Sequence, residues 1–287
     1  MMCRTNTETV EAIEKLLIQH DHRGMSRIRQ ALDPGYLGRA AQLLRTQRGT
    51  AYIVTGFPVA GTFETDGPAG AMALYRACER HLLRPTILSE SILTQCLTPN
   101  FRCLALAAGS EEQIRRSVSN LYQSAPPDLV ISIERPGAAR DGRYYNMAGK
   151  DISADCTPAE AYLDLANCPT IAIGDGGNEV GMGKAISLLE GLDIHPAVST
   201  CDELVVADVS NWAAYALSAL TYYQSGRTAD ITEIISDIRK DLSLLVESGA
   251  VDGVTGAQTA TEDGFVEGSG CALIEAIITL LNQTSAL

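Results

Sequence analysis

The clearest chemical signal in the sequence is a glycine-rich turn within Thr170–Lys184, TIAIGDGGNEVGMGK. Its apolar, β-branched start is typical of a buried strand, and the residues after the turn have helical spacing. Glycines at such a turn allow positive φ angles and a close approach of a ligand to the backbone. The oxygen atoms of Asp175, Asn178 and Glu179 suit a metal cation or an ammonium group, whereas their negative charge opposes a phosphate. We therefore expect a cation site at this turn.

Acidic residues also follow other predicted strands. Glu64 and Asp66 lie in the loop after the first predicted strand, and Glu134 directly follows the fourth. The carboxyl ends of parallel strands meet at one edge of a sheet, where α/β proteins bind their ligands. These separate loops are therefore expected to converge on one site. Locally, Asp66 is predicted to cap the helix that follows it, and Ser210 or Asn211 to cap the helix after them.

The elements that must position these residues follow from the apolar periodicity. The predicted strands cover residues 51–55, 85–88, 101–107, 129–133, 170–173 and 203–207. Helical patterns lie between most of them, and one follows the glycine-rich turn to Leu189. This alternation predicts an α/β fold with a mainly parallel β-sheet and helices on both faces, a three-layer α/β/α, Rossmann-like arrangement. We expect a single domain over residues 1–287, with 1–50 as an N-terminal helical segment packed on it.

The composition favours a cytoplasmic enzyme. A net charge of −13 opposes a nucleic-acid partner, since no basic patch could dominate that field. The eight cysteines are scattered singly without a CxxC pair, which indicates reduced thiols in a reducing compartment. The acidic N-terminus has no apolar run, so neither a signal peptide nor a transit peptide is expected, and no apolar window is long enough for a membrane span. A homo-oligomer is compatible with these features.

Segments that carry these features resemble, in the same order, the D-glutamate cyclase family. They are TGFPVAGTFETDGPAGAMAL, ERPGAARDGRYYNMAGKDIS, TIAIGDGGNEVGMG, ADVSNWAAYAL and VDGVTG, and they span roughly residues 50–256. The resemblance implies an α/β fold, conversion of D-glutamate to 5-oxo-D-proline with loss of water, and a divalent cation in an acidic cavity. Vertebrate members of the family have a mitochondrial address, whereas this N-terminus does not resemble one, so a cytoplasmic form is expected.

Such a cyclisation joins the α-amine of glutamate to its own γ-carboxylate, so the amine must lose a proton and the carboxylate charge must be masked. Mg²⁺ or Mn²⁺ in an oxygen cage suits the masking. The predicted metal ligands are Asp66, Glu134, Asp175 and Asn178. Glu179 and Glu64 are the candidate general bases, because crowded like charges raise the proton affinity of a carboxylate. The predicted contacts to the acidic amino-acid substrate are Arg135, Arg143, Asn146, Asn211 and the backbone of Gly176 and Gly177.

Two other functions fit the same residues. A metal-dependent hydrolase or phosphatase acting on a small molecule would use the same cage to activate water. A non-catalytic module that binds a small ligand on a Rossmann-like sheet would need no base. A nucleotide ligand is disfavoured, because Glu179 stands where the third glycine of GxGxxG should be and the surrounding loops are acidic.

Overall fold

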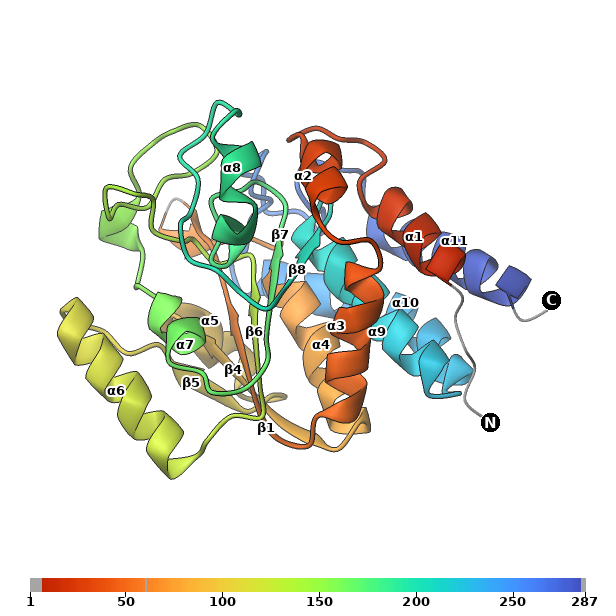
Figure 1. Cartoon of the computed structure of the whole chain (residues 1–287), viewed down its shortest axis with the longest axis horizontal. Helices are drawn as coiled ribbons and strands as arrows, with labels where there is room; N and C mark the ends of the chain where they lie inside the picture. The colour runs from red at the N-terminus through yellow and green to blue at the C-terminus, as the bar shows by residue number, and fades with distance from the viewer. Residues whose placement is uncertain (1–6, 60, 285–287) are drawn as a thin grey trace.

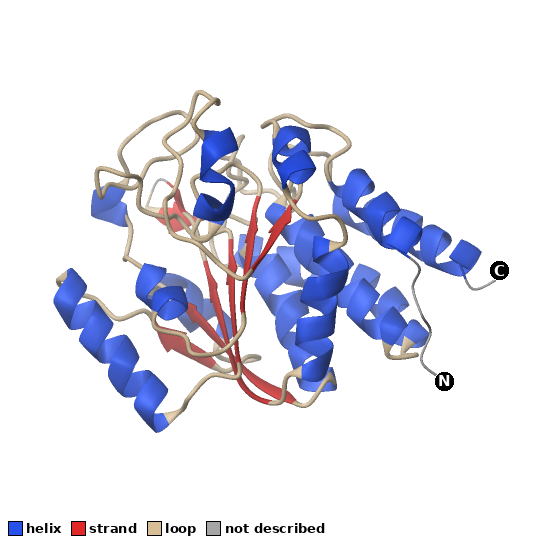
Figure 2. Cartoon of the chain, viewed as in Figure 1, coloured by secondary structure: helices blue, strands red, loops and turns tan. Residues whose placement is uncertain are grey.

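The structure is a computed structural model that describes residues 7–59 and 61–284. Within these residues, a six-stranded sheet has the order β5-β4-β1-β6-β7-β8, and all its pairings are parallel (Figures 1 and 2). The strands are β1 (Gly49–Thr55), β4 (Leu83–Ser89), β5 (Cys103–Ala105), β6 (Leu129–Ile133), β7 (Thr170–Gly174) and β8 (Glu203–Val206). A short antiparallel ribbon, β2 (Pro58–Val59) with β3 (Thr62–Phe63), lies in the loop after β1. The predicted parallel sheet is confirmed.

Helices cover both faces of this sheet. They are α1 (Thr7–Leu17), α2 (Met25–Ala31), α3 (Tyr36–Thr46), α4 (Pro68–Arg80), α5 (Ser91–Leu97), α6 (Glu111–Ser124), α7 (Glu160–Asp164), α8 (Ile186–Leu189), α9 (Ser210–Gln224), α10 (Thr228–Glu247) and α11 (Ser269–Thr284). Successive side chains of a strand point to opposite faces, so Ile53 enters a larger core and Val54 a smaller one. Helices α3, α4 and α9 pack on the first face, with α1, α10 and α11 outside them, and α6 and α7 cover the second (Figure 1). Among the described helices, none is both long and apolar enough to cross a lipid bilayer.

The strand order creates a crevice at the carboxyl ends of the strands. The chain leaves β1 through α4 to reach β4 on one side, and it later returns through α6 to place β6 on the other side. The loops that follow β1 and β6 therefore turn in opposite directions, which is where open α/β sheets bind ligands. The arrowheads of the strands point toward the loops at the top of the view in Figure 2. The acidic loops expected to converge lie at this edge.

The helix predicted after the glycine-rich turn is instead two short pieces, the 3₁₀ helix η2 (Met182–Ala185) and α8. Gly181 has a φ of 95°, which no helix continues through. Gly183 lies so close to the returning chain that a Cβ there would be 2.3 Å from the carbonyl oxygen of Val198. The segment after α8 thus folds back over the turn and prevents a longer helix. The edge strand β5 is also shorter than the predicted 101–107.

Truncation of Ile173 to alanine is expected to lower the free energy of unfolding by about 2–5 kcal/mol. Ile173 is fully buried in β7, in the centre of the larger core, so the truncation leaves a cavity there. Val266→Ala serves as the control, since Val266 is 79% exposed and its truncation should change stability by less than about 0.5 kcal/mol. Urea denaturation measures both variants. Equal stabilities for the two would contradict the packing described above.

Candidate active site

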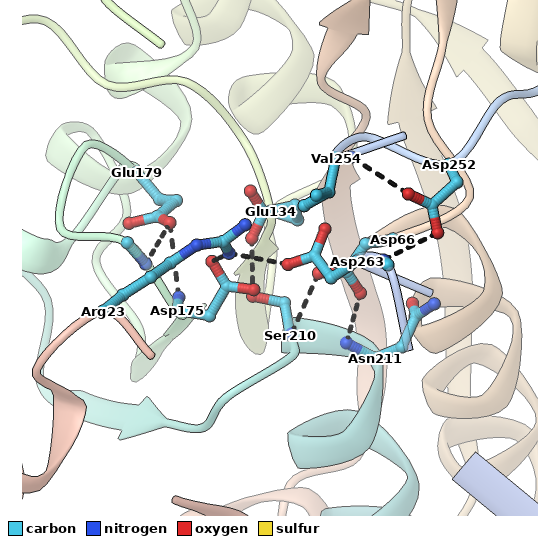
Figure 3. A network of polar contacts seen from close by, with 12 residues as sticks. Arg23, Asp66, Glu134, Asp175, Glu179, Ser210, Asn211, Asp252, Val254 and Asp263 are labelled. Atoms are coloured by element: carbon cyan, nitrogen blue, oxygen red, sulfur yellow. Dashed lines mark hydrogen bonds and ion pairs between the residues drawn. The ribbon is translucent and has the colours of Figure 1, made fainter. Parts of the chain in front are cut away.

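A cavity of about 460 Å³ lies at this edge of the sheet. Residues that follow β1, β6 and β7 line it, together with Arg23 from the segment between α1 and α2 and the loop that precedes α11. Around it stand carboxylates that come from four separate loops (Figure 3). They are Glu64, Asp66, Glu134, Asp175 and Asp263, hereafter the acid cluster. The predicted convergence of Glu64, Asp66, Glu134 and Asp175 on one place is therefore observed.

The acid cluster carries an excess of negative charge. Burial raises the pKa of all five carboxyls, and repulsion from neighbouring carboxylates adds to the shift. Among the described residues, Arg23 is the cation paired with the cluster, with Nη1 2.5 Å from Asp175 and 2.6 Å from Asp263. One guanidinium does not balance five carboxylates, so the site has room for a further positive charge.

Asp66 and Asn211 hold two helix starts together. Asp66 accepts hydrogen bonds from the backbone N–H of Ser210 (3.0 Å) and of Asn211 (2.7 Å) at the start of α9. In return, Asn211 Oδ1 accepts from the backbone N–H of Gly67 (2.9 Å) and of Gly70 (2.6 Å) at the start of α4. Both cap predictions were wrong in the same way. Because α4 and α9 pack with their N-termini together, each helix is capped by a side chain that precedes or begins the other.

Glu134 occupies a constrained position directly after β6. Its φ is 41°, a left-handed conformation that costs free energy for a residue with a side chain. Ser210 Oγ donates a hydrogen bond to Oε2 of Glu134 at 2.6 Å, and a Cβ at Gly67 would lie 2.6 Å from the Cβ of Glu134. Asp263 also has a positive φ, of 52°. Two members of the acid cluster are thus held in conformations that the surrounding structure must impose.

Glu179 anchors its own turn. Its carboxylate accepts the backbone N–H groups of Asp175 (3.2 Å), Gly176 (2.7 Å) and Gly177 (2.7 Å). These amides, predicted to face the substrate, therefore point to Glu179. Both carboxylate oxygens of Glu179 are thus bound by amides that shape the turn, and this position argues for a structural role rather than for the predicted role of base.

Two oxygen atoms, one in the acid cluster and one next to it, lack a hydrogen-bond donor among the described residues. They are Oδ2 of Asp175 and Oδ1 of Asn178, both on buried side chains. Asn178 donates through Nδ2 to the carbonyl of Tyr145 at 2.8 Å, which fixes the orientation of the amide. Oxygen atoms of Glu134, Asp175 and Glu179 also lie within 4.8 Å of one another. Buried oxygens without donors, next to a group of carboxylates, fit a hard divalent cation.

Arg135 and Arg143, the predicted substrate contacts, lie elsewhere. Arg135 is fully buried, where it pairs with Glu90 at 2.6 Å, donates to the carbonyl of Gly56 at 2.8 Å and contacts the carbonyl of Thr157. Arg143 is on the surface, 3.9 Å from Asp141. Neither lines the cavity.

Comparisons with known proteins show the family of this chain. A family model described as D-glutamate cyclase-like, C-terminal, matches residues 13–278. The chain belongs to the D-glutamate cyclase-like family. The resemblance predicted from separate segments is thereby confirmed, and the matched region includes Arg23.

A human relative and a solved structure complete the comparisons. The chain is 32% identical over 209 residues to the human protein named "D-glutamate cyclase, mitochondrial". This alignment covers 63% of this chain and 34% of the human protein. This D-glutamate cyclase-like chain thus spans about a third of the length of its curated relative. A crystal structure of an exopolyphosphatase-related protein from Bacteroides fragilis aligns with a TM-score of 0.39 and 12% identity, over 89% of this chain and 58% of that one. A likeness of that size supports no conclusion about function.

In this D-glutamate cyclase-like chain, the site also contains residues that were not predicted from the sequence. Arg23 and Asp263 belong to segments that follow helices, so the rule that places strand ends together does not reach them. Lys150 is exposed, lines the cavity and has no ion-pair partner among the described residues. Asn146, one of the predicted substrate contacts, does line the cavity, and its Oδ1 accepts the backbone N–H of Lys150 at 2.9 Å, which shapes the loop that carries this lysine.

Glu262 is a buried carboxylate that binds three side chains of α9 next to the acid cluster. It accepts hydrogen bonds from Asn211 Nδ2 (2.9 Å), from the hydroxyl of Tyr215 (2.9 Å) and from Trp212 Nε1 (3.4 Å). Burial nevertheless raises the pKa of Glu262 to about 6, although these donors favour the charged form.

Stability should therefore depend on pH through Glu262. A raised pKa means that the folded state favours the protonated form, so its contribution is complete below the ordinary value of 4.5 and is lost as the pH rises through about 6. The two values differ by an amount that corresponds to about 2 kcal/mol. We compare the free energy of unfolding of the wild type with that of Glu262→Gln. The difference, wild type minus variant, is expected to fall by this amount between pH 4 and 7. Chemical denaturation over a pH series measures it, and a constant difference would contradict the burial effect.

Proposed function

We propose that this protein converts D-glutamate to 5-oxo-D-proline with loss of water, assisted by a divalent cation. Membership in the family and the name of the human relative support this reaction. The observation that carries the proposal is the acid cluster itself: buried carboxylates and two donorless oxygens that surround a cavity of about 460 Å³. The negative charge of such a site attracts both a metal cation and an ammonium group. An amino acid with a second carboxylate supplies the ammonium group for the acidic residues and a carboxylate for the cation.

The residues divide into a metal-binding set and a proton-accepting group. Glu134, Asp175 and Asn178 would hold the cation, as predicted, whereas the oxygens of Asp66 are used at the start of α9. When bound, the cation masks the charge of the γ-carboxylate and stabilises the oxyanion that forms on it. Mg²⁺ and Mn²⁺ are the ions that suit oxygen ligands.

Glu64 is the better placed of the two predicted bases. Its carboxylate lines the cavity, and no described residue donates a hydrogen bond to it. Burial raises the pKa of Glu64, with Asp263 and Asp175 adding to the shift, so the carboxylate has a high affinity for a proton. The substrate ammonium gives a proton to Glu64, and the amine nitrogen attacks the γ-carbon. One carboxylate oxygen then leaves as water, with a second nitrogen proton and the proton that Glu64 returns.

Cations in the cavity lining favour a small acidic amino acid as the partner. Arg23 and Lys150 are the cations that line the cavity, and they replace the predicted Arg135 and Arg143 as candidates to bind the substrate carboxylates. A protein with a net charge of −13 offers little to nucleic acid. A cytoplasmic location and a homo-oligomer stay predictions of the sequence.

The test is direct turnover. Purified protein with Mn²⁺ or Mg²⁺ is incubated with D-glutamate, and 5-oxoproline is measured by chiral chromatography. We expect product that depends on the protein and disappears when a chelator is added. L-Glutamate and a panel of phosphate esters are run in parallel. Turnover of a phosphate ester without any lactam formation would favour the hydrolase interpretation and contradict the cyclase.

A further inference from the structure

A nitrogen cation already occupies one part of the acid cluster. Oxygen atoms of Asp66, Asp175 and Asp263 lie within 4.8 Å of one another, and we call these residues the aspartate triad. Nη1 of Arg23 lies 2.5 Å from Oδ1 of Asp175 and 2.6 Å from Oδ2 of Asp263 (Figure 3). The triad therefore holds a positively charged N–H group between carboxylates that come from different loops.

Arg23 reaches the triad from a loop that is fixed independently. Asp208 accepts the backbone N–H groups of His20 (2.7 Å) and Asp21 (2.9 Å), which anchors the segment between α1 and α2 at the end of β8. The Arg23 side chain is 21% exposed and lines the cavity, so its guanidinium borders the space that a ligand would enter. The anchor keeps the arginine at the cavity.

The triad retains unused capacity for a ligand. Glu64 beside the triad is 6% exposed and lines the cavity, and no described residue donates a hydrogen bond to its carboxylate, whereas Oδ2 of Asp175 belongs to the proposed metal site. Three carboxylates face one guanidinium, and the nearby Glu64 adds a further negative charge that raises the pKa of Asp66. An incoming ammonium, with three N–H donors, would satisfy more of these oxygens than one guanidinium nitrogen does.

We propose that the aspartate triad is the binding site for the substrate ammonium, and that Arg23, its occupant in the free protein, leaves it to pair with the α-carboxylate. The inference rests on the proposed function, because it requires an amino acid as substrate. Ammonium and guanidinium carry the same charge, so the exchange keeps the charge of the triad constant. The two substrate groups share one carbon atom, so an arginine displaced by the first lies within reach of the second.

This site also explains how the amine meets its base. A Cβ at Gly253 would lie 2.1 Å from Oε2 of Glu64 and 3.5 Å from Oδ1 of Asp263, so these two carboxylates are neighbours across this glycine. An ammonium in the triad therefore lies beside Glu64, and one of its protons can pass to that carboxylate. The neutral amine then faces the γ-carboxylate, and Arg23 holds the α-carboxylate away from the reacting atoms.

The test compares two ligands that differ only in the ammonium group, D-glutamate and glutarate. Trp212 is the single tryptophan of the chain and lies 4.7 Å from Phe265 and 6.0 Å from His20, so its fluorescence reports on both loops of the site. Stopped-flow fluorescence of the Mn²⁺-loaded protein gives the affinity for each ligand before turnover. We expect Asp263→Asn to weaken D-glutamate binding about 10- to 100-fold, the effect of one charged hydrogen bond, and glutarate binding less than about threefold.

Two further variants make the result decisive. Arg23→Gln should weaken both ligands about 10-fold or more, because both lose the carboxylate partner, and it should keep the preference for D-glutamate because the triad is then empty. Glu267→Gln, an exposed change in the same loop, is the control and should alter neither affinity. Circular dichroism confirms that each variant is folded.

The outcomes separate this inference from the proposed function. An unchanged ratio of the two affinities in Asp263→Asn, with D-glutamate still turned over by the wild type, would overturn the ammonium site and leave the cyclase in place. Loss of the preference for D-glutamate in this variant, without any formation of 5-oxoproline by the wild type, would support the ammonium site and overturn the cyclase. Loss of the preference for D-glutamate over glutarate in Arg23→Gln would show that the arginine, and not the triad, distinguishes the two ligands.

Discussion

Asp175→Asn is expected to lower kcat/KM for D-glutamate by about 10³-fold, since one preorganised charged contact in an active site has an effect of this size. Asp175 takes part in both groups of close carboxylates, and its Oδ2 is one of the two donorless oxygens. The amide retains the shape of the side chain but offers the cation one weaker oxygen ligand. We therefore expect Mn²⁺ affinity, measured by calorimetry, to fall together with activity.

The same variant should remain folded without the metal. Burial raises the pKa of Asp175, and this shift survives the opposing effect of Arg23, so ionisation of Asp175 costs more free energy in the folded protein than in the unfolded chain. Its replacement by a neutral group removes that cost, and the melting temperature should not fall. Asp164→Asn is the matched control, because Asp164 is in a surface ion pair with Arg115. If Asp175→Asn keeps a tenth of the activity and the wild-type metal affinity, the metal assignment is wrong.

The sheet and the convergence of the acidic loops could be predicted because both follow from short-range patterns. Apolar runs such as Thr170–Gly174 indicate buried strands, and helices between them require parallel pairing. Parallel pairing then brings all strand ends to one edge. This is why Asp66, Glu134 and Asp175 were predicted to meet, although Asp66 and Asp175 are 109 positions apart in the chain.

The partners of each side chain depend on tertiary packing, which the local patterns do not contain. Asp66 has the sequence signature of a cap for its own helix, yet the neighbouring helix start is nearer in space and takes both oxygens. Arg135 stands beside a predicted ligand in the sequence, but its side chain is fully buried away from the cavity and pairs with Glu90. Arg23 follows a helix rather than a strand, so no rule about strand ends could include it.

Glu64→Gln is expected to lower kcat for D-glutamate by about 10²–10⁴-fold, the range for loss of a positioned general base. The change removes a proton acceptor but almost no volume. Because no described residue donates to the Glu64 carboxylate, the variant breaks no hydrogen bond that the structure shows. Mn²⁺ affinity should therefore change little, in contrast to Asp175→Asn. A parallel loss of metal affinity would identify Glu64 as a ligand instead.

The pH profile provides the sharper evidence about Glu64. A base must be ionised to accept a proton, so kcat/KM of the wild type should rise with pH through the raised pKa of Glu64, and this rise should be absent in Glu64→Gln. Gly253→Ala offers an independent disturbance, because the added Cβ would lie 2.1 Å from Oε2 of Glu64 and must displace that carboxylate. Gly253 is not among the glycines with a positive φ, so the backbone itself accepts alanine. A loss of activity in this variant, with the carboxylate still present, would show that the position of Glu64 matters and not only its charge.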